Sequence, residues 1–140
     1  MLKISITTVL ITIMMTMSSF ISVKPSEEDL VGFWKVDQYS KQNENLPVEN
    51  LNFTLQCSVE GRIGKFTGRT EKNFFSGLYE IKSKKQIELK GLMSTKYEES
   101  HVSKSFIESF QSVSEFTLED DKLLLTNDRD GAVIVLTKTD

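Results

Sequence analysis

The sequence of 140 residues has few of the side chains on which chemistry in proteins usually depends: it contains one cysteine and one histidine. Cys57 cannot form an intramolecular disulfide, so the core alone has to stabilise the fold. His101 has no second histidine or cysteine at metal-ligand spacing, and the chain has no glycine-rich phosphate loop. We therefore predict no catalytic residue, no metal site and no cofactor.

The chain also lacks a strong excess of charge of either sign. It has 17 basic and 20 acidic residues, with a formal net charge of −3. A nucleic-acid-binding protein needs a basic face, so this balance argues against nucleic acid as a partner. The acidic runs EDD, residues 119–121, and DRD, residues 128–130, lack the ligand spacing of a calcium-binding EF-hand and are predicted to be solvated turns.

The start of the chain differs from the rest. Lys3 is the only charged residue before Lys24, and the segment between them is apolar with scattered serine and threonine. This pattern is typical of a secretory signal peptide, so we predict a signal peptide at 1–22, a mature domain at 23–140, and a secreted, periplasmic or cell-envelope location. The alternative is a retained anchor, which would be the only contact with a membrane, because the uncharged run reaches the lower limit for spanning a bilayer.

Apolar and polar residues alternate over much of the mature chain, which predicts strands. The clearest case is residues 51–57, where every second residue is apolar and Cys57 lies among the buried positions. Residues 40–50 are polar and contain Pro47, so they are predicted to be a loop. Further strands are expected at 33–39, 63–67, 73–81, 86–90 and 132–138, with a hairpin at 114–127.

One amphipathic helix is predicted over residues 101–113, because Val102, Phe106, Phe110 and Val113 recur at helical spacing. The order of elements predicts a mainly β fold: a small antiparallel lipocalin-like barrel or curled sheet with one α-helix before the last strands. Its large aromatic residues favour a filled interior over a ligand cavity. The residues in question are Trp34, Phe53, Phe66 and Phe75.

Several short motifs, in this order, resemble the META domain family. They are GRTEKNFFSGLY at 68–79, GLMSTKYEE at 91–99, SFIESF in the predicted helix and SEFTLEDDKLLLTNDRDGAVIVL near the end. The resemblance covers nearly the whole mature chain. The residues that match the family's motifs are Gly32 and Trp34 at the start, Asn73, Phe75, Gly77 and Tyr79 in the middle, and Ser94, Thr95 and Lys96 after them.

The chain departs from the family pattern at two positions. Where relatives often carry two cysteines, it has Lys72 and Glu99, and Glu71 replaces the glycine before the first. The resemblance implies that these two positions lie close together. We therefore expect an ion pair between Lys72 and Glu99 in place of the disulfide; the alternative is two unrelated exposed charges.

The resemblance implies a lipocalin-like fold but no defined activity, because the family is associated with envelope stress and, in some members, with motility or virulence. We expect a non-enzymatic, stress-related secreted or envelope domain that acts by binding, for example to an envelope protein. The main alternative is a carrier of a small apolar ligand. An inhibitor or adaptor that uses a sheet edge or the DRDG loop, residues 128–131, also remains open. An enzyme would require His101 to act with Glu98 or Glu99, for which the sequence gives no positive evidence.

Overall fold

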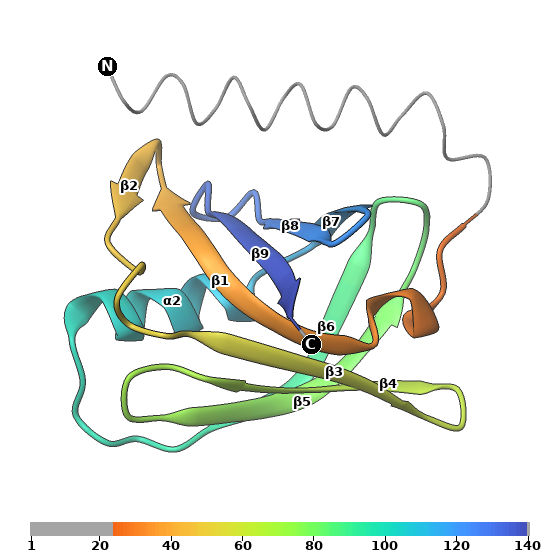
Figure 1. Cartoon of the computed structure of the whole chain (residues 1–140), viewed down its shortest axis with the longest axis horizontal. Helices are drawn as coiled ribbons and strands as arrows, with labels where there is room; N and C mark the ends of the chain where they lie inside the picture. Colours follow the sequence, from red (N-terminus) through yellow and green to blue (C-terminus); the bar gives the residue numbers. More distant parts are fainter. Residues whose placement is uncertain (1–23, 140) are drawn as a thin grey trace.

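A computed structural model describes residues 24–139 and shows one curled β-sheet with one α-helix (Figure 1). This part of the chain contains nine strands, the α-helix and a short 3-10 helix. In chain order they are η1 (Glu27–Leu30), β1 (Gly32–Lys41), β2 (Glu44–Leu46), β3 (Thr54–Glu60), β4 (Ile63–Arg69), β5 (Phe74–Ile81), β6 (Ile87–Ser94), α2 (His101–Gln111), β7 (Glu115–Glu119), β8 (Lys122–Thr126) and β9 (Val133–Thr139).

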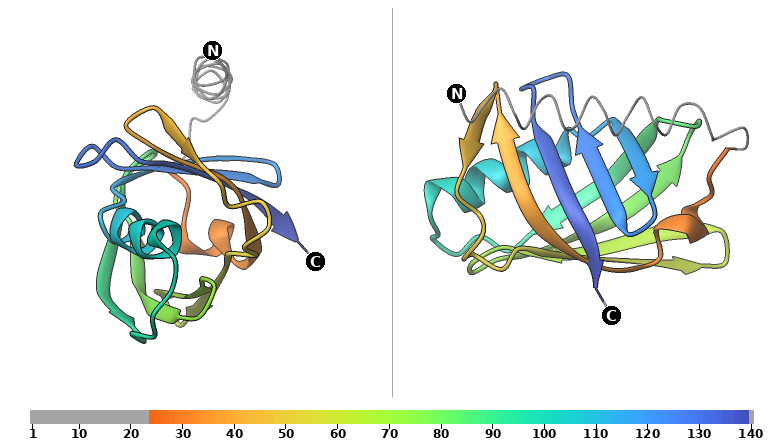
Figure 2. Two further views of the ribbon diagram at one scale, coloured as in Figure 1. Left: turned by 90° about the vertical axis from the view of Figure 1, so that its left-hand side faces the viewer. Right: turned by 45° about the horizontal axis from the view of Figure 1, so that its top comes forward.

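The strands form a single antiparallel sheet in the order β6-β5-β4-β3-β1-β9-β8-β7, with β2 paired to the end of β1. The sheet curls into a half-barrel (Figure 2). Its two outer strands meet at one end, where the Ile87 amide donates to the Ser114 carbonyl at 3.0 Å and the Phe116 amide to the Lys85 carbonyl at 2.8 Å. The predicted fold class, a mainly β curled antiparallel sheet with one helix before the last strands, is confirmed.

Helix α2 lies on the concave side of the curled sheet and covers its interior (Figure 2). The predicted apolar stripe of the helix provides the contact. The Phe106 ring lies 5.4 Å from Tyr39 on β1 and 4.9 Å from Phe53, and the Phe110 ring lies 5.1 Å from Phe75 on β5. These edge and tilted contacts between rings are favourable beyond the area they bury, by about 0.5–1.5 kcal/mol each.

The prediction of a loop over residues 40–50 is wrong in part. β1 continues to Lys41 and turns back into β2 through Gln42 and Asn43, whose φ angles are 52° and 64°. Two consecutive residues with positive φ form the kind of two-residue turn that matches the twist of a hairpin. Asparagine tolerates this conformation better than most residues, but no glycine marked the turn in the sequence.

Two strand boundaries differ from the prediction by more than two residues. β3 begins at Thr54 and not at residue 51, because the Leu51 amide donates to the Val48 carbonyl at 3.0 Å and so closes a turn. β6 runs on to Ser94, beyond the predicted end at residue 90, after passing a left-handed glycine at Gly91. Within residues 24–139, no helix has the length and apolar character needed to cross a membrane. The predicted signal peptide at 1–22 lies outside the described residues.

Candidate functional site

The motif residue Asn73 connects the start of β5 to the segment that follows β6. Its side chain is 3% exposed, and its Nδ2 donates to the Tyr97 carbonyl at 2.8 Å while its Oδ1 accepts from the Tyr97 amide at 2.8 Å. Thr95 adds two contacts, because its Oγ1 donates to Asn73 Oδ1 at 2.8 Å and accepts from the Phe74 amide at 2.9 Å. These side chains extend the pairing of β5 with β6 past the end of the strand.

Glu99 also binds the loop before β5, residues 70–73. Its Oε1 accepts from Thr70 Oγ1 at 2.7 Å and from the Lys72 amide at 3.2 Å, and its Oε2 accepts from Asn73 Nδ2 at 2.6 Å. The structure therefore brings Lys72 and Glu99 together, as the resemblance implied. The contact uses the main chain of Lys72: within residues 24–139, no ion pair within 4.0 Å joins their side chains.

Glu71, next to this cluster, lies at the beginning of α2. Its carboxylate accepts hydrogen bonds from the hydroxyl of Ser100, the N-cap residue, and from Ser103 Oγ at 2.5 Å. These hydrogen bonds hold the pKa of the Glu71 carboxyl below its usual value. The first turn of α2 has no acidic residue of its own, so Glu71 supplies the negative charge that the start of a helix favours.

The remaining motif residues lie in or against the core. Trp34, Phe75 and Tyr79 are each at most 3% exposed, and Trp34 Nε1 donates to the Leu30 carbonyl at 2.9 Å. A Cβ at Gly77 would lie 2.6 Å from the Phe66 ring, which explains the absence of a side chain at this position. The β5–β6 register shifts between Ser76 and Leu78, which places Gly77 at a bulge.

Of the other motif residues, Gly32 and Ser94 lie at strand ends, and Lys96 is exposed in the segment after β6. Gly32 begins β1 with a φ of 145°, a conformation that residues with a side chain rarely adopt. Ser94 ends β6, pairs with Phe75 and donates from Oγ to the Thr95 carbonyl at 2.7 Å. The family-motif residues thus act mainly to form and join the elements of the fold.

A second polar cluster, which the sequence did not predict, connects β1 to α2. The Tyr39 hydroxyl lies 2.9 Å from Ser105 Oγ and 2.7 Å from Ser109 Oγ. Ser109 donates to Asp130 Oδ2 at 2.8 Å, and the Lys41 ammonium donates to Ser105 Oγ at 3.4 Å.

Lysine can only donate and an ionised aspartate can only accept, so every proton in this chain of bonds is assigned. Ser109 uses its proton on Asp130, so Tyr39 donates to Ser109 and Ser105 donates to Tyr39. Each group therefore donates to the next in the order Lys41, Ser105, Tyr39, Ser109, Asp130. The three hydroxyl-bearing residues are almost completely buried, which is typical of a network that orders the core.

The residues considered for an enzyme do not come together. His101 is exposed at the start of α2. Glu98 pairs with the Lys104 ammonium at 3.2 Å, and Glu99 is bound to the loop at 70–73. Within residues 24–139, no group of three or more histidine, cysteine or acidic side chains is placed to hold a metal ion.

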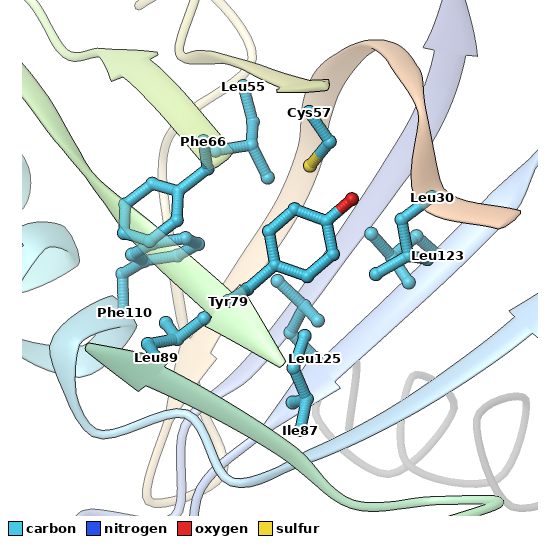
Figure 3. Close-up of a pocket in the computed structure, with 10 residues that line it drawn as sticks. All are labelled: Leu30, Leu55, Cys57, Phe66, Tyr79, Ile87, Leu89, Phe110, Leu123 and Leu125. Carbon is cyan, nitrogen blue, oxygen red and sulfur yellow. The ribbon is translucent and has the colours of Figure 1, made fainter. Parts of the chain in front are cut away.

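The interior is filled by side chains. An apolar cavity of about 10 Å³ lies between Cys57, Tyr79 and the β8 residues Leu123 and Leu125 (Figure 3). This is close to the space that a single water molecule needs. Sites for small organic ligands usually enclose about 300–1,000 Å³. Burial raises the pKa of the Cys57 thiol to about 12, which makes it an unreactive part of the core.

An open depression lies on the opposite side of the sheet. We call the side of β1 and β3–β6 that faces away from α2 the outer face. A groove of about 430 Å³ crosses it over β4, β5 and β6. We call it the outer groove; its lining includes Thr67, Phe74, Ser76, Met93 and Thr95.

Large apolar residues are exposed around this groove. Phe74 on β5 is 60% exposed and Met93 on β6 is 73% exposed. Leu78, also on β5, is exposed too. The sequence contained a signal for this: Phe74 and Phe75 are adjacent in a strand, so one of them had to face outward. In residues 24–139 the exposed large hydrophobic residues are Phe33, Ile63, Phe74, Leu78, Met93 and Tyr97.

The charges of the outer face are divided between its two ends. Arg69 pairs with Phe74 in the β4–β5 register, and its guanidinium lies 5.4 Å from the centre of the Phe74 ring. Lys35 lies in the same row, two strands further along, through Thr54. Among residues 24–139, neither cation has a carboxylate within 4.0 Å.

At the other end of the outer face the charges neutralise one another. The Lys90 ammonium lies 2.8 Å from Glu80 and 3.2 Å from Glu88. Lys65 pairs with Glu60 across the β3–β4 hairpin. On the outer face, Arg69 thus lies beside the outer groove and Lys35 lies further along the same row, both without a carboxylate partner.

Comparison with known families identifies the chain. The model of the META domain family matches residues 28–140, nearly the whole described part. The chain belongs to the META domain family. The matched residues include the Asn73 loop and Glu99, so these contacts belong to the META domain.

Solved structures share the fold of this META domain. An NMR structure of a protein from Burkholderia xenovorans has a TM-score of 0.63 at 14% identity, and covers 85% of this chain and 94% of its own. A crystal structure of a DUF4847 family protein from Bacteroides vulgatus has a TM-score of 0.62 at 16% identity, with coverage of 81% and 99%. A search of curated proteins found no match.

Proposed function

We propose that this META domain is a non-enzymatic binding protein of the secreted or cell-envelope space, and that it holds its partner, an envelope protein, on the outer face of its sheet. The observation that carries the proposal is the position of the apolar surface. The cavity of the interior has only about 10 Å³, whereas the outer groove has about 430 Å³ and is bordered by Phe74 and Met93.

The exposure of these two side chains supports the choice of surface. Both are more than half exposed, and they border a depression that also contains the hydroxyls of Thr67 and Ser76. Apolar residues that are grouped around a groove and rimmed by polar groups are characteristic of protein interaction sites. An internal carrier site is not favoured, because an apolar ligand would have to displace the aromatic side chains that α2 places in the core.

The state of the polar side chains supports a role without catalysis. Asn73, Glu99 and the Tyr39 cluster satisfy one another, and in residues 24–139 no buried side-chain nitrogen or oxygen is without a hydrogen-bond partner. Catalytic groups normally converge on a cleft that a substrate can reach. Here the polar side chains instead form hydrogen bonds with one another within the fold.

The N-terminal segment supports the proposed location. Residues 1–22 carry one charge, Lys3, and are otherwise apolar or hydroxylated, which is typical of a signal for export. The association of the family with envelope stress suggests the process in which the partner takes part. In this setting the chain would fold without an oxidant, because it has a single cysteine.

The test is photo-crosslinking in the organism that makes the protein. The full chain, with its own leader, carries a photoreactive amino acid either at Ser76 in the outer groove or at Glu108 on the exposed side of α2. We expect a discrete protein adduct from position 76, found in the envelope or secreted fraction and lost in Phe74→Ser/Met93→Ser. Equal adducts from both positions, or adducts only from position 108, would contradict the proposal.

A further inference from the structure

We infer that the outer groove accepts one apolar side chain of an extended, acidic segment of a partner protein, and that Arg69 and Lys35 bind the carboxylates of this segment. The inference rests on the proposed binding function and names the chemistry of the partner. It follows from two neighbouring features, an apolar depression and a row of cations without carboxylate partners.

The groove is suited to a side chain more than to a broad apolar surface. Phe74 and Met93 line it together with the small polar residues Thr67 and Ser76. In the strand register, Thr67 pairs with Ser76 and Ser76 pairs with Met93, so these residues form one row across β4, β5 and β6. A single apolar anchor that fills such a depression is the usual centre of a protein interface.

The cations lie in the adjacent row. Phe74, Arg69, Thr54 and Lys35 are paired in turn across β5, β4, β3 and β1, and directly paired residues face the same side of a sheet. Neighbouring strands are about 4.8 Å apart, so Arg69 and Lys35 are about 5 and 14 Å from Phe74. An extended peptide advances about 3.3 Å per residue. Acidic residues within about four positions of the anchor therefore reach both cations.

The distribution of charge favours a peptide over an anionic membrane. A membrane would cover the whole outer face, including the end where Glu60, Glu80 and Glu88 lie. Lysine ammonium groups neutralise these carboxylates, so this end of the face gives anionic headgroups no net attraction. A segment that crosses only the groove and the Arg69 row avoids this end. Arg69 suits a carboxylate because its planar guanidinium can form two parallel hydrogen bonds.

The test is a selection from a displayed library of random 12-residue peptides on the protein purified as its host produces it. We expect enriched peptides to carry an aromatic or aliphatic residue with aspartate or glutamate within about four positions. Fluorescence anisotropy with an enriched peptide should show affinity at least about tenfold weaker, or 1.4 kcal/mol, for Phe74→Ser/Met93→Ser and for Arg69→Glu. Binding should weaken as salt increases.

Two matched variants serve as controls. Ile63→Ser changes an apolar residue of β4 that is 54% exposed on the same sheet but outside the groove, and Arg62→Glu reverses a charge in the adjacent turn. Both should bind the peptide as the wild type does. All the substituted residues are exposed, so the thermal unfolding of every variant should match that of the wild type, which separates lost binding from lost folding.

Several results would overturn the inference. They are the absence of any enriched peptide, enriched peptides without acidic residues, and peptides whose binding survives Phe74→Ser/Met93→Ser or Arg69→Glu. Binding to phosphatidylglycerol vesicles that the same variants abolish would instead identify a membrane surface as the ligand. The proposed function is judged separately by the adduct at position 76: an adduct without acidic peptides keeps the binding face and removes only the stated partner chemistry.

Discussion

The side chain of Asn73 pairs with the main chain of Tyr97 as a strand residue would, donating to its carbonyl and accepting from its amide, both at 2.8 Å. The loop before β5 is thereby held to the segment that leads into α2. Glu99 completes the junction by accepting from Asn73 Nδ2 at 2.6 Å. A buried amide with partners on both of its polar atoms is costly to replace, because each partner is then left unsatisfied.

Asn73→Asp should therefore destabilise the protein strongly. The change keeps the size of the side chain but places a carboxylate against Glu99 and the Tyr97 carbonyl, where a donor is required. We expect urea denaturation to show a loss of at least about 2 kcal/mol in the free energy of unfolding at neutral pH. Asn45→Ala, at an exposed position on β2, should change it by less than about 0.5 kcal/mol. Similar values for the two variants would mean that the junction does not support the fold.

Cysteines at positions 72 and 99 should form a disulfide. The Lys72 amide is 3.2 Å from the Glu99 carboxylate, so the two residues are close neighbours. In Lys72→Cys/Glu99→Cys, oxidation should raise the free energy of unfolding by about 2–4 kcal/mol over the reduced form. Lys72→Ser/Glu99→Ser should be as unstable as the reduced variant, because it also lacks the Glu99 hydrogen bonds. Free thiols that persist at both positions in air would show that the positions are not adjacent in solution.

Tyr39→Phe should destabilise the protein, whereas removing the hydroxyl of an exposed tyrosine should not. Without the Tyr39 hydroxyl, Ser105 loses an acceptor and Ser109 loses a donor, in the core. We expect a loss of about 1–3 kcal/mol in the free energy of unfolding. Tyr97→Phe removes a hydroxyl from a side chain that is 69% exposed and should have almost no effect. Equal midpoints in urea for the two variants would count against the network.

The Glu71 carboxylate should make stability depend on pH. Hydrogen bonds from Ser100 and Ser103 hold its pKa below the unfolded value, which is about 4.3. Its stabilising contribution is therefore fully present above that unfolded value and is lost as the pH falls through the lower, folded pKa. The difference in unfolding free energy between wild type and Glu71→Gln should be largest near neutral pH and shrink in acid. Ser103→Ala should weaken the pH dependence that Glu71 contributes. A difference between wild type and Glu71→Gln that does not change with pH would contradict this prediction.

Cys57 should react only when the protein unfolds. Burial raises its pKa to about 12, so almost no thiolate is present at neutral pH. Labelling with a disulfide reagent should follow the denaturant unfolding curve recorded by circular dichroism. Cys57→Ser/Ser58→Cys places the thiol at the neighbouring exposed position of β3, and should label at once without denaturant. Rapid labelling of the wild type in native buffer would show that the core is open.

The sequence predicted the fold where one pattern determined the structure. Alternation placed Cys57 inside the sheet, and the spacing of Phe106 and Phe110 identified the face of α2 that packs on it. β2 was missed because its turn uses Gln42 and Asn43 with positive φ, where the sequence shows only polar residues.

The sites were harder to predict, because they depend on contacts between distant residues. The family resemblance placed Lys72 near Glu99, but the main-chain hydrogen bond replaces the expected contact between charges. The network around Tyr39 joins residues 66 and 70 positions apart, and serines in a helix carry no sign of such a role in the sequence. The outer groove was equally hidden, since it combines residues of β4, β5 and β6.

Backbone amide NMR separates a partner on the outer face from a ligand in the interior most directly. A peptide enriched in the selection is titrated into the labelled protein, and the chemical shifts are mapped onto the structure. We predict shifts at Thr67, Ser76 and Thr95, with the amides around the small core cavity unchanged. Shifts concentrated at Tyr79, Leu123 and Leu125, with the outer groove unaffected, would place binding inside the half-barrel and contradict the proposed function.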